Sequence, residues 1–258
     1  MMNQDNQKSS GLQVALQLWT VRALAEKNMA ETLAEVAQIG YGAVEFAGFG
    51  TARVGDIHAA LSTNGLKAVS AHVPYDQLIT HPESVIEDLH VLGCNRVVVP
   101  AFAPHHFASI DNASRLADSL NALAMRFSRA SLLFAYHNED YDFAPIPGST
   151  KTLWSALVNN TDPAFVELQL DVFTATAMNV NPIALMRDYG SRITSLHVCD
   201  SRGGRYVPIG HGDLNWRMLL EAASHTACTS LIVEHDAPPD PIADAQTSLQ
   251  ALKQIISR

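Results

Sequence analysis

Basic residues are scarce in this sequence. It has 17 Lys and Arg against 26 Asp and Glu in 258 residues, which gives a formal net charge of −9. A protein that coats nucleic acid or binds an anionic membrane surface needs an excess of positive charge, so the composition argues against both kinds of partner. No run of about 18 apolar residues occurs, so no membrane span is expected. Apolar residues still make up 47%, enough for a large core, which excludes a disordered chain.

Cysteine and signal features are also lacking. The three cysteines, Cys94, Cys199 and Cys228, form no CxxC pair, which argues against a disulfide framework or a thiolate zinc site. The first eleven residues, MMNQDNQKSSG, contain no cationic stretch leading into an apolar run, so they do not predict a secretory signal. We expect residues 1–11 to be a flexible polar tail and the protein to be cytoplasmic.

No Pro-, Gly- or Ser-rich linker divides the chain, so residues 12–258 are expected to form one domain. Short apolar runs alternate with segments of helical periodicity, and their starts are roughly 31 residues apart, the length of one strand–helix unit. Eight such units in about 250 residues predict a (β/α)₈ barrel. The alternative is an open doubly wound sheet, which usually has a Gly-rich loop after its first strand; residues 20–24 contain no glycine. The expected strands are Val14–Trp19, Ala43–Phe46, Lys67–His72, Arg96–Val99, Leu132–His137, Val166–Asp171, Ile193–His197 and Ser230–Glu234.

Ionisable residues gather where these strands end. Asp, Glu and His are 37 of 258 residues. In a set of eight positions taken at random, about one would therefore carry one of these residues. Six of the eight expected strand ends do so, namely Glu45, His72, His137, Asp171, His197 and Glu234. Since active sites of such barrels lie at the C-terminal ends of the strands, this pattern predicts a site there.

Four of these residues have the composition of a metal site. His137, Asp171, His197 and Glu234 supply two imidazoles and two carboxylates, and the two negative charges would balance one divalent cation. Mixed nitrogen and oxygen ligands suit Mn²⁺, Co²⁺, Zn²⁺, Mg²⁺ or Fe²⁺ without fixing the order. A hydrogen-bonded network of His and carboxylate side chains without a metal is the alternative.

Several motifs resemble the xylose-isomerase-like TIM-barrel family, which comprises sugar isomerases and epimerases and also endonuclease IV. The resemblance covers nearly the whole chain. The matching segments are GYGAVEFAGF (40–49), GLKAVSAHVP (65–74), YHNEDYDFAPI (136–146), LQLDVFTA (168–175), SLHVCD (195–200), IGHGDLNW (209–216) and IVEHDAPPDP (232–241).

The resemblance implies a divalent metal near the ends of strands five to eight, held by His137, Asp171, His197 and Glu234. The sequence departs from the family at His137, where well-characterised epimerases usually have Glu. Glu139 and His211 also stand where similar sequences have His and Glu, so a His and a Glu have exchanged places in the two motifs.

Isomerisation beside a carbonyl needs a proton acceptor and stabilisation of an enolate. The expected acid/base residues are Glu234 and Glu139, with Glu45 and His72 either assisting proton transfer or pairing with each other. Candidate substrate-binding residues are Trp19, His211, Arg205 and Trp216. Packing or surface roles are the alternative for the two tryptophans and for Arg205, and unrelated sequence drift is the alternative for His211.

These features predict a metal-dependent sugar or keto-sugar isomerase or epimerase that acts on a small carbohydrate. A lyase or dehydratase acting on an oxidised sugar, glycoside or inositol derivative would use the same groups. Cleavage of abasic DNA needs more metal ligands and a positively charged surface that binds the DNA. The 17 basic residues of this chain argue against such a surface. A non-catalytic sugar-binding barrel and a homo-oligomeric state both stay open.

Overall fold

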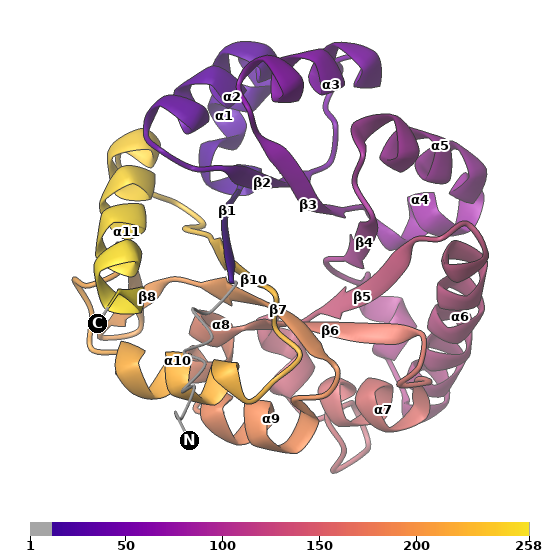
Figure 1. The fold of residues 1–258 in the computed structure, drawn as a ribbon. Coiled ribbons are helices and arrows are strands. Elements are labelled where there is room, and N and C mark those ends of the chain that lie inside the picture. The colour runs from indigo at the N-terminus through magenta and orange to yellow at the C-terminus, as the bar shows by residue number, and fades with distance from the viewer. Residues whose placement is uncertain (1–11, 258) are drawn as a thin grey trace, which may run out of the picture.

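The computed structural model describes residues 12–257 and shows a closed barrel of eight parallel strands surrounded by helices (Figure 1). The strand order around the barrel is β1-β10-β7-β6-β5-β4-β3-β2. The predicted (β/α)₈ fold is therefore confirmed, and the open doubly wound sheet is excluded. The tail predicted for residues 1–11 lies outside the described residues.

The strands match the predicted runs with small shifts at the ends. They are β1 (Gln13–Gln17), β2 (Ala43–Ala47), β3 (Lys67–His72), β4 (Arg96–Val99), β5 (Leu133–His137), β6 (Val166–Asp171), β7 (Ile193–Val198) and β10 (Ser230–Val233). The largest shift concerns Trp19, which belongs to a short 3₁₀ helix (η1, Leu18–Val21) and not to the first strand. The side chain of Gln17 causes this early end, because its Oε1 accepts a hydrogen bond from the backbone N of Trp19 (3.2 Å).

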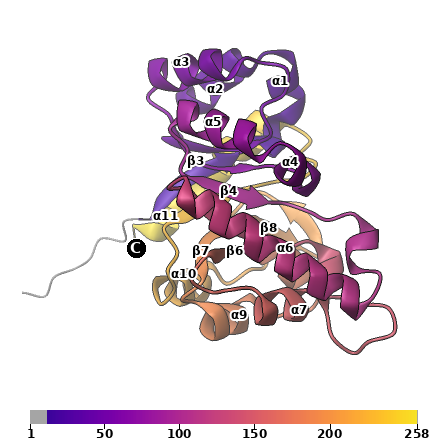
Figure 2. The ribbon, with the colours of Figure 1, turned by 90° about the vertical axis from the view of Figure 1, so that its right-hand side faces the viewer.

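Helices cover the outside of the barrel, as the side view shows (Figure 2). They are α1 (Arg22–Lys27), α2 (Met29–Gln38), α3 (Val54–Thr63), α4 (Tyr75–Thr80), α5 (Pro82–Leu92), α6 (Ile110–Arg129), α7 (Leu153–Asn160), α8 (Val172–Ala177), α9 (Pro182–Tyr189), α10 (Trp216–Ser224) and α11 (Pro241–Ile256). The sequence marks both ends of α5, since Pro82 opens it and Gly93 closes it with a left-handed φ of 67°.

The βα loop after β7 contains a hairpin that the periodicity did not predict. Its strands are β8 (Asp200–Arg202) and β9 (Arg205–Val207), paired antiparallel around Gly203 and Gly204. Both glycines have positive φ angles, 57° and 75°, which glycine adopts without steric cost. Three-residue strands are too short to show a period, so the sequence gives no sign of the hairpin apart from these two glycines.

Side chains that point into the barrel form two kinds of layer. Alternate residues of a strand share a face, and Ala15, Ala43 and Ile232 are fully buried in a small apolar cluster of their own. Two residues further along the same strands are Gln17, Glu45 and Glu234, so the interior changes from apolar to polar toward the C-terminal ends. The fold thereby places polar groups on an apolar floor directly below the barrel mouth.

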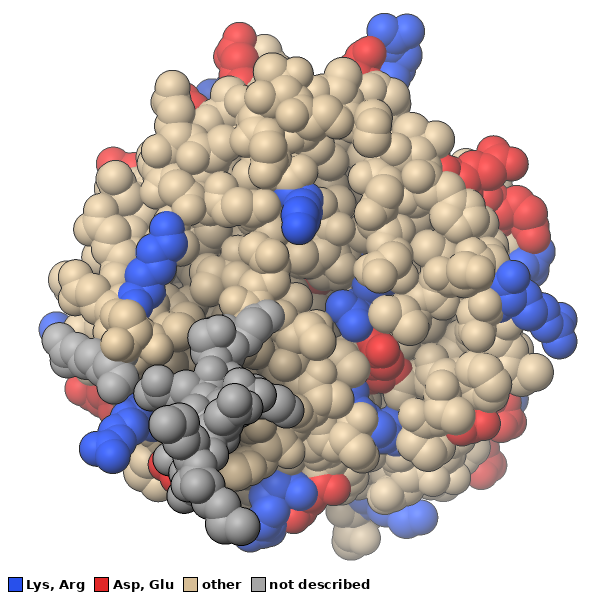
Figure 3. Space-filling model, viewed as in Figure 1, with Lys and Arg blue, Asp and Glu red and all other residues tan. Residues whose placement is uncertain are grey.

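Charge on the described surface is mixed. Seen from the side of Figure 1, Lys and Arg side chains are scattered among Asp and Glu and form no continuous band (Figure 3). Within residues 12–257, no helix combines the length and the apolar character needed to cross a membrane.

Candidate active site

The C-terminal ends of the barrel strands surround a cavity of about 650 Å³. His72, His137 and Asp171 end β3, β5 and β6, and Glu234 follows β10; all four side chains line the cavity. Residues 137, 171 and 234 therefore converge from three strands, as the positions of the strand ends predicted. A cavity of this size falls within the roughly 300–1,000 Å³ of small-molecule sites.

One group of side chains at the base of this cavity can hold a metal ion; Asp171 and Glu234 line the cavity, and His197 is buried behind them. Asp171, His197 and Glu234 each offer a ligand atom, and these atoms lie within 4.8 Å of one another. Asp171 is held by its own helix, because its Oδ1 caps α8 by accepting a hydrogen bond from Thr174 N (2.6 Å). Burial, with a smaller contribution from Glu234, raises the pKa of Asp171 to about 6 although His197 opposes the shift.

His197 lies between two carboxylates. Its Nδ1 is 2.7 Å from Glu234 Oε2, and its Nε2 is 2.5 Å from Glu45 Oε1. Burial would lower the pKa of His197, but these two carboxylates hold it well above its usual value. The carboxylates thus favour a positive charge at this place. A divalent ion bound by Asp171, His197 and Glu234 would take the place of the proton that His197 Nδ1 shares with Glu234, so the donor set fits a metal.

His137 stands apart from the carboxylate group but next to His197. Its ligand atom belongs to a second group, with His72 and His197, and the rings of His137 and His197 are 4.6 Å apart between centroids. Burial lowers the pKa of His137 well below its usual range, and the neighbouring histidines add to the shift. The structure therefore joins three of the four predicted ligands in one group and places His137 beside it as a neutral imidazole.

Gln169 sets which nitrogen of His137 carries the hydrogen. The Nε2 of Gln169 donates to Glu45 Oε2 (2.7 Å), and a buried carboxylate can only accept, so the orientation of the amide is fixed. Its Oε1 then accepts from His137 Nδ1 (3.1 Å) and from His72 Nε2 (2.7 Å). The remaining nitrogen of His137, Nε2, keeps its lone pair available for a ligand.

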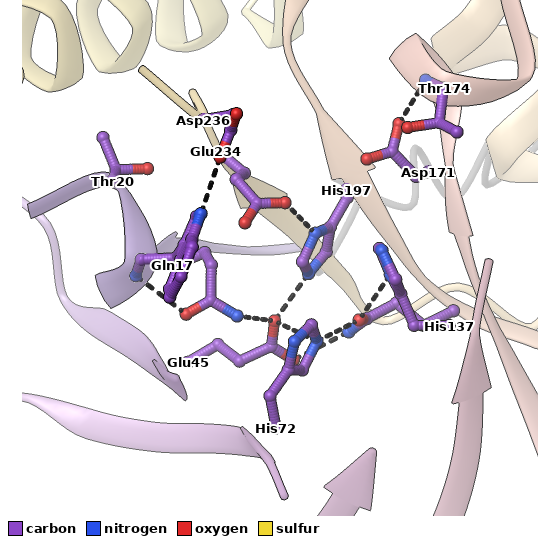
Figure 4. Close-up of polar contacts among 12 residues, drawn as sticks. Gln17, Thr20, Glu45, His72, His137, Asp171, Thr174, His197, Glu234 and Asp236 are labelled. Carbon is purple, nitrogen blue, oxygen red and sulfur yellow. Dashed lines mark hydrogen bonds and ion pairs between the residues drawn. The ribbon is translucent and has the colours of Figure 1, made fainter. Parts of the chain in front are cut away.

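Glu45 occupies the centre of the polar layer below the cavity (Figure 4). Its side chain is fully buried and does not line the cavity. Burial would raise its pKa, but His72 and His197 hold the pKa of Glu45 well below its usual value. The carboxylate is in contact with His72 (3.1 Å), one of the two arrangements that the sequence left open. Its hydrogen-bond donors are Gln17 Nε2, Ser70 Oγ, Gln169 Nε2 and His197 Nε2.

Glu139 lines the cavity from the loop after β5. Burial raises the pKa of its carboxyl to about 7, and the carboxylates of Asp171 and Glu234 add to the shift. Its backbone is held by Asp142, whose Oδ2 accepts a hydrogen bond from Glu139 N (2.6 Å). The structure thus brings Glu139 into the same cavity as Glu234, with a carboxyl group that can carry a proton near neutral pH.

The buried carboxyl group of Asp142 is expected to make the free energy of unfolding depend on pH. It is fully buried, its Oδ1 lacks a hydrogen-bond partner within the described part of the chain, and burial raises its pKa to about 8. The folded protein keeps this proton between about pH 4 and 8, where the unfolded chain releases it. From this group, the free energy of unfolding falls as pH rises, by up to about 1.4 kcal/mol per unit.

The variant Asp142→Asn is expected to lose this part of the pH dependence of the free energy of unfolding, because an amide does not titrate. Its oxygen can still accept the hydrogen bond from Glu139 N, so the loop is kept. Urea unfolding at several pH values between 5 and 8 measures it. Asp118→Asn, at an exposed position of α6, is the control and should follow the wild-type curve. Parallel curves for wild type and Asp142→Asn would contradict the prediction.

The four candidate substrate-binding residues divide into one that lines the cavity and three that do not. Trp19 lines it and is 42% exposed, and its Nε1 donates to Asp236 Oδ1 (2.7 Å). Arg205 and His211 are exposed outside the lining. Trp216 is buried, and its Nε1 donates to Asp200 Oδ2 (2.8 Å). The contacts of Arg205, His211 and Trp216 with substrate stay predictions.

The IGHGDLNW motif surrounds the carboxylate of Asp200. Besides the indole of Trp216, Asp200 accepts hydrogen bonds from the backbone N of Gly210 (3.0 Å) and of Leu214 (3.2 Å). A Cβ at Gly212 would overlap this carboxylate, so only glycine fits there. The motif therefore fixes the loop that follows the β8–β9 hairpin.

Other residues of the site escaped the sequence reasoning. Phe173 and Met178 line the cavity from α8 and its C-terminal cap, and Tyr206 lines it from β9. The rings of Phe173 and Tyr206 are stacked, with 3.5 Å between centroids. Phe173 lies two residues beyond the predicted strand end at Asp171, which was an available signal. Tyr206 had none, because its hairpin was not predicted.

The sequence profile of the xylose isomerase-like TIM barrel matches residues 33–255. The chain therefore belongs to the xylose isomerase-like TIM barrel family, as its motifs indicated. No curated protein sequence matches it.

Solved structures with the same fold have low sequence identity to this chain. A sugar phosphate isomerase/epimerase from Parabacteroides distasonis is 20% identical, with a TM-score of 0.81 over 97% of this chain and 98% of that one. A D-psicose 3-epimerase from Clostridium cellulolyticum is 13% identical, with a TM-score of 0.71 over 95% and 99%. A probable 3-DHS dehydratase from Bacillus anthracis is 10% identical, with a TM-score of 0.73 over 94% and 99%. At these identities the likeness establishes the fold.

Proposed function

We propose that this protein is a metal-dependent isomerase or epimerase of a sugar or keto-sugar. The observation that carries the proposal is the meeting of Asp171, His197 and Glu234 near the C-terminal ends of the strands. Asp171 and Glu234 line the same cavity as Glu139. The isomerase and epimerase activities named for two of the similar structures support it.

Asp171, His197 and Glu234 would hold the metal, with His137 Nε2 beside them as a further nitrogen donor. A bound divalent ion supplies Lewis acidity, which polarises a carbonyl group and stabilises negative charge on its oxygen. Asp171 is kept in position by Thr174 N, and His197 by Glu45 (2.5 Å). Fixed ligands of this kind need little reorganisation when an ion binds.

Two carboxylates face the substrate from opposite strands. Glu234 follows β10 and Glu139 follows β5, and these strands are not neighbours in the barrel. One carboxylate takes the proton from the carbon beside the carbonyl, and the electron pair of the C–H bond moves into the enolate. The other carboxylate returns a proton, either to the opposite face of the same carbon or to the neighbouring carbon. In the second case the hydroxyl proton of the neighbouring carbon passes to the former carbonyl oxygen, so that the carbonyl group moves by one carbon. Epimerisation or isomerisation results.

Exchange of substrate hydrogen with solvent tests this function. Free ketoses incubated with the protein in D₂O with Mn²⁺ or Co²⁺, and examined by NMR after removal of the metal, are expected to gain deuterium beside the carbonyl. Glu139→Gln should slow the exchange by about 100- to 10,000-fold, the usual contribution of a general acid or base. The control is Glu87→Gln, at an exposed position of α5.

Two outcomes would contradict the proposal. An eliminated product in the NMR spectrum would assign the site to a lyase or dehydratase, the alternative that the sequence left open. Unchanged exchange in Glu139→Gln would remove this residue from the proton transfer.

A further inference from the structure

The walls of the cavity are rich in carboxyl groups. Among residues 12–257, five of those that line the cavity have carboxyl groups and none is Lys or Arg. The five are Glu139, Asp140, Asp171, Glu234 and Asp236. A divalent ion between Asp171 and Glu234 would balance two of these charges, and the others would still repel an anionic group. Phosphate sites in proteins are built in the opposite way, from Arg, Lys or free backbone N–H groups.

The cation at the rim of the cavity is already engaged. Arg22 lies 4.3 Å from the centroid of the Trp19 ring, above its face. Its Nη1 donates to the carbonyl oxygens of Trp19 (2.9 Å) and Asp236 (2.5 Å). The guanidinium thus holds η1 against the loop after β10 and is not directed at a ligand. Arg202 and Arg205 of the hairpin are exposed outside the lining.

Helix N-termini near the mouth are also occupied. Barrels of this fold often bind phosphate at the N-terminus of a helix after strands seven and eight. In this chain α11 is capped by Asp240, whose Oδ1 accepts from Ala243 N (3.1 Å), and its first residue, Pro241, has no N–H. Asp171 caps α8 in the same way. Carboxylates therefore stand at the N-termini of α11, after β10, and of α8, after β6. The helix after β7, α10, is capped by Asn215, whose Oδ1 accepts from Met218 N (3.2 Å).

One wall of the cavity is largely apolar. Phe173, Ala177 and Met178 come from α8 and its cap, and Tyr206 comes from β9. Aromatic faces of this kind suit the C–H face of a sugar or an uncharged substituent. A phosphoryl group placed there would lose its water, and among these four residues only the hydroxyl of Tyr206 could donate to it.

We infer that the substrate is an uncharged sugar or glycoside and that sugar phosphates are excluded. The carboxylates of the lining, the capped helix ends and the apolar wall of Phe173, Ala177, Met178 and Tyr206 all disfavour a phosphoryl group. The inference rests on the proposed function and deepens it. It separates this chain from the sugar phosphate activity named for the similar structure from Parabacteroides distasonis.

Paired substrates test the inference. Each free ketose and its terminal phosphate are compared for deuterium exchange in D₂O with the same metal. The expected result is a kcat/KM at least about 100-fold higher for the free ketose, because like-charge contacts discriminate strongly. A kcat/KM for the phosphate equal to or above that of the free ketose would overturn the inference and leave the proposed isomerase function intact.

A variant that adds a positive charge to the apolar wall tests the same inference. Met178→Arg, at a position that is 37% exposed, puts a guanidinium on the lining and should narrow the preference for the free ketose by about tenfold or more, since Arg binds phosphate in a bidentate manner. Met218→Arg, on α10 outside the lining and 52% exposed, is the matched control and should keep the wild-type preference. If both variants changed the preference for the free ketose equally, the assignment of Met178 to the substrate-facing wall would be contradicted.

Binding separates failure of the inference from failure of the proposed function. Hexitols and hexitol phosphates cannot react, so their affinity, measured by calorimetry, reports the charge preference alone. Tighter binding of hexitols together with no exchange on any ketose would overturn the proposed function and support the charge preference. Tighter binding of the phosphates would overturn the charge preference.

Discussion

The double variant His197→Ala/Asp171→Asn is expected to lose its metal. Wild-type protein should bind about one divalent ion per chain at the group of ligands that Asp171, His197 and Glu234 form, because the second possible group shares His197 with it. Loss of a supporting partner alone costs roughly 10- to 100-fold in metal affinity, so removal of two ligands should cost more than about 100-fold. Elemental analysis after dialysis and calorimetric titration with Mn²⁺ or Co²⁺ measure the change.

The matched control is His58→Ala/Asp188→Asn, which changes the same residue types at exposed positions of α3 and α9. It should bind metal as the wild type does. Asp171→Asn alone is a second probe, since an asparagine can still cap α8 through its oxygen and the fold is kept. Wild-type protein that takes up no metal even after soaking in Mn²⁺ or Co²⁺ would contradict the metal site.

Glu45→Gln is expected to destabilise the protein by about 3–5 kcal/mol, the range for breaking a buried charge pair. The carboxylate of Glu45 accepts from four side chains, including His197, and is also in contact with His72 (3.1 Å). A glutamine offers one oxygen in place of two, and its NH₂ group would face donors. At least one buried donor then loses its partner, and the positive charge that Glu45 favours on His197 loses a counter-charge.

Urea unfolding at pH 7 measures this change in the free energy of unfolding. Glu221→Gln, exposed on α10, makes the same substitution without the buried network and should lie within about 0.5 kcal/mol of the wild type. A Glu45→Gln protein as stable as the control would show that the polar layer does not depend on the charge of Glu45.

The sequence predicted the architecture because the pattern of a parallel barrel repeats. Strands buried on both faces are continuous apolar runs, and Gly93 and Pro82 mark the ends of α5 through their backbone geometry. The β8–β9 hairpin breaks this repeat, and short polar strands such as Asp200–Arg202 have no periodic signal. Trp19 left the predicted strand because of a local hydrogen bond from its own backbone to Gln17.

The candidate site was predicted in part. Ionisable residues at strand ends pointed to Asp171, His197 and Glu234, because the ends of parallel strands meet at one face of a barrel. The depth of each side chain did not follow from the sequence. Glu45 lies below the cavity and not at its mouth. Gln169, which fixes the hydrogen on His137, lies two residues before Asp171 on the same face of β6. Depth depends on the register between strands, which the sequence does not reveal.

The most direct test of the account is a metal titration of deuterium exchange. Metal-free protein is incubated with an uncharged ketose in D₂O, Mn²⁺ or Co²⁺ is added in steps, and NMR follows the hydrogen beside the carbonyl. The account predicts that the exchange rate rises with added metal and levels off at about one ion per chain, since one group of ligands binds it. Exchange that does not respond to the metal, or that is absent at every metal concentration, would contradict it.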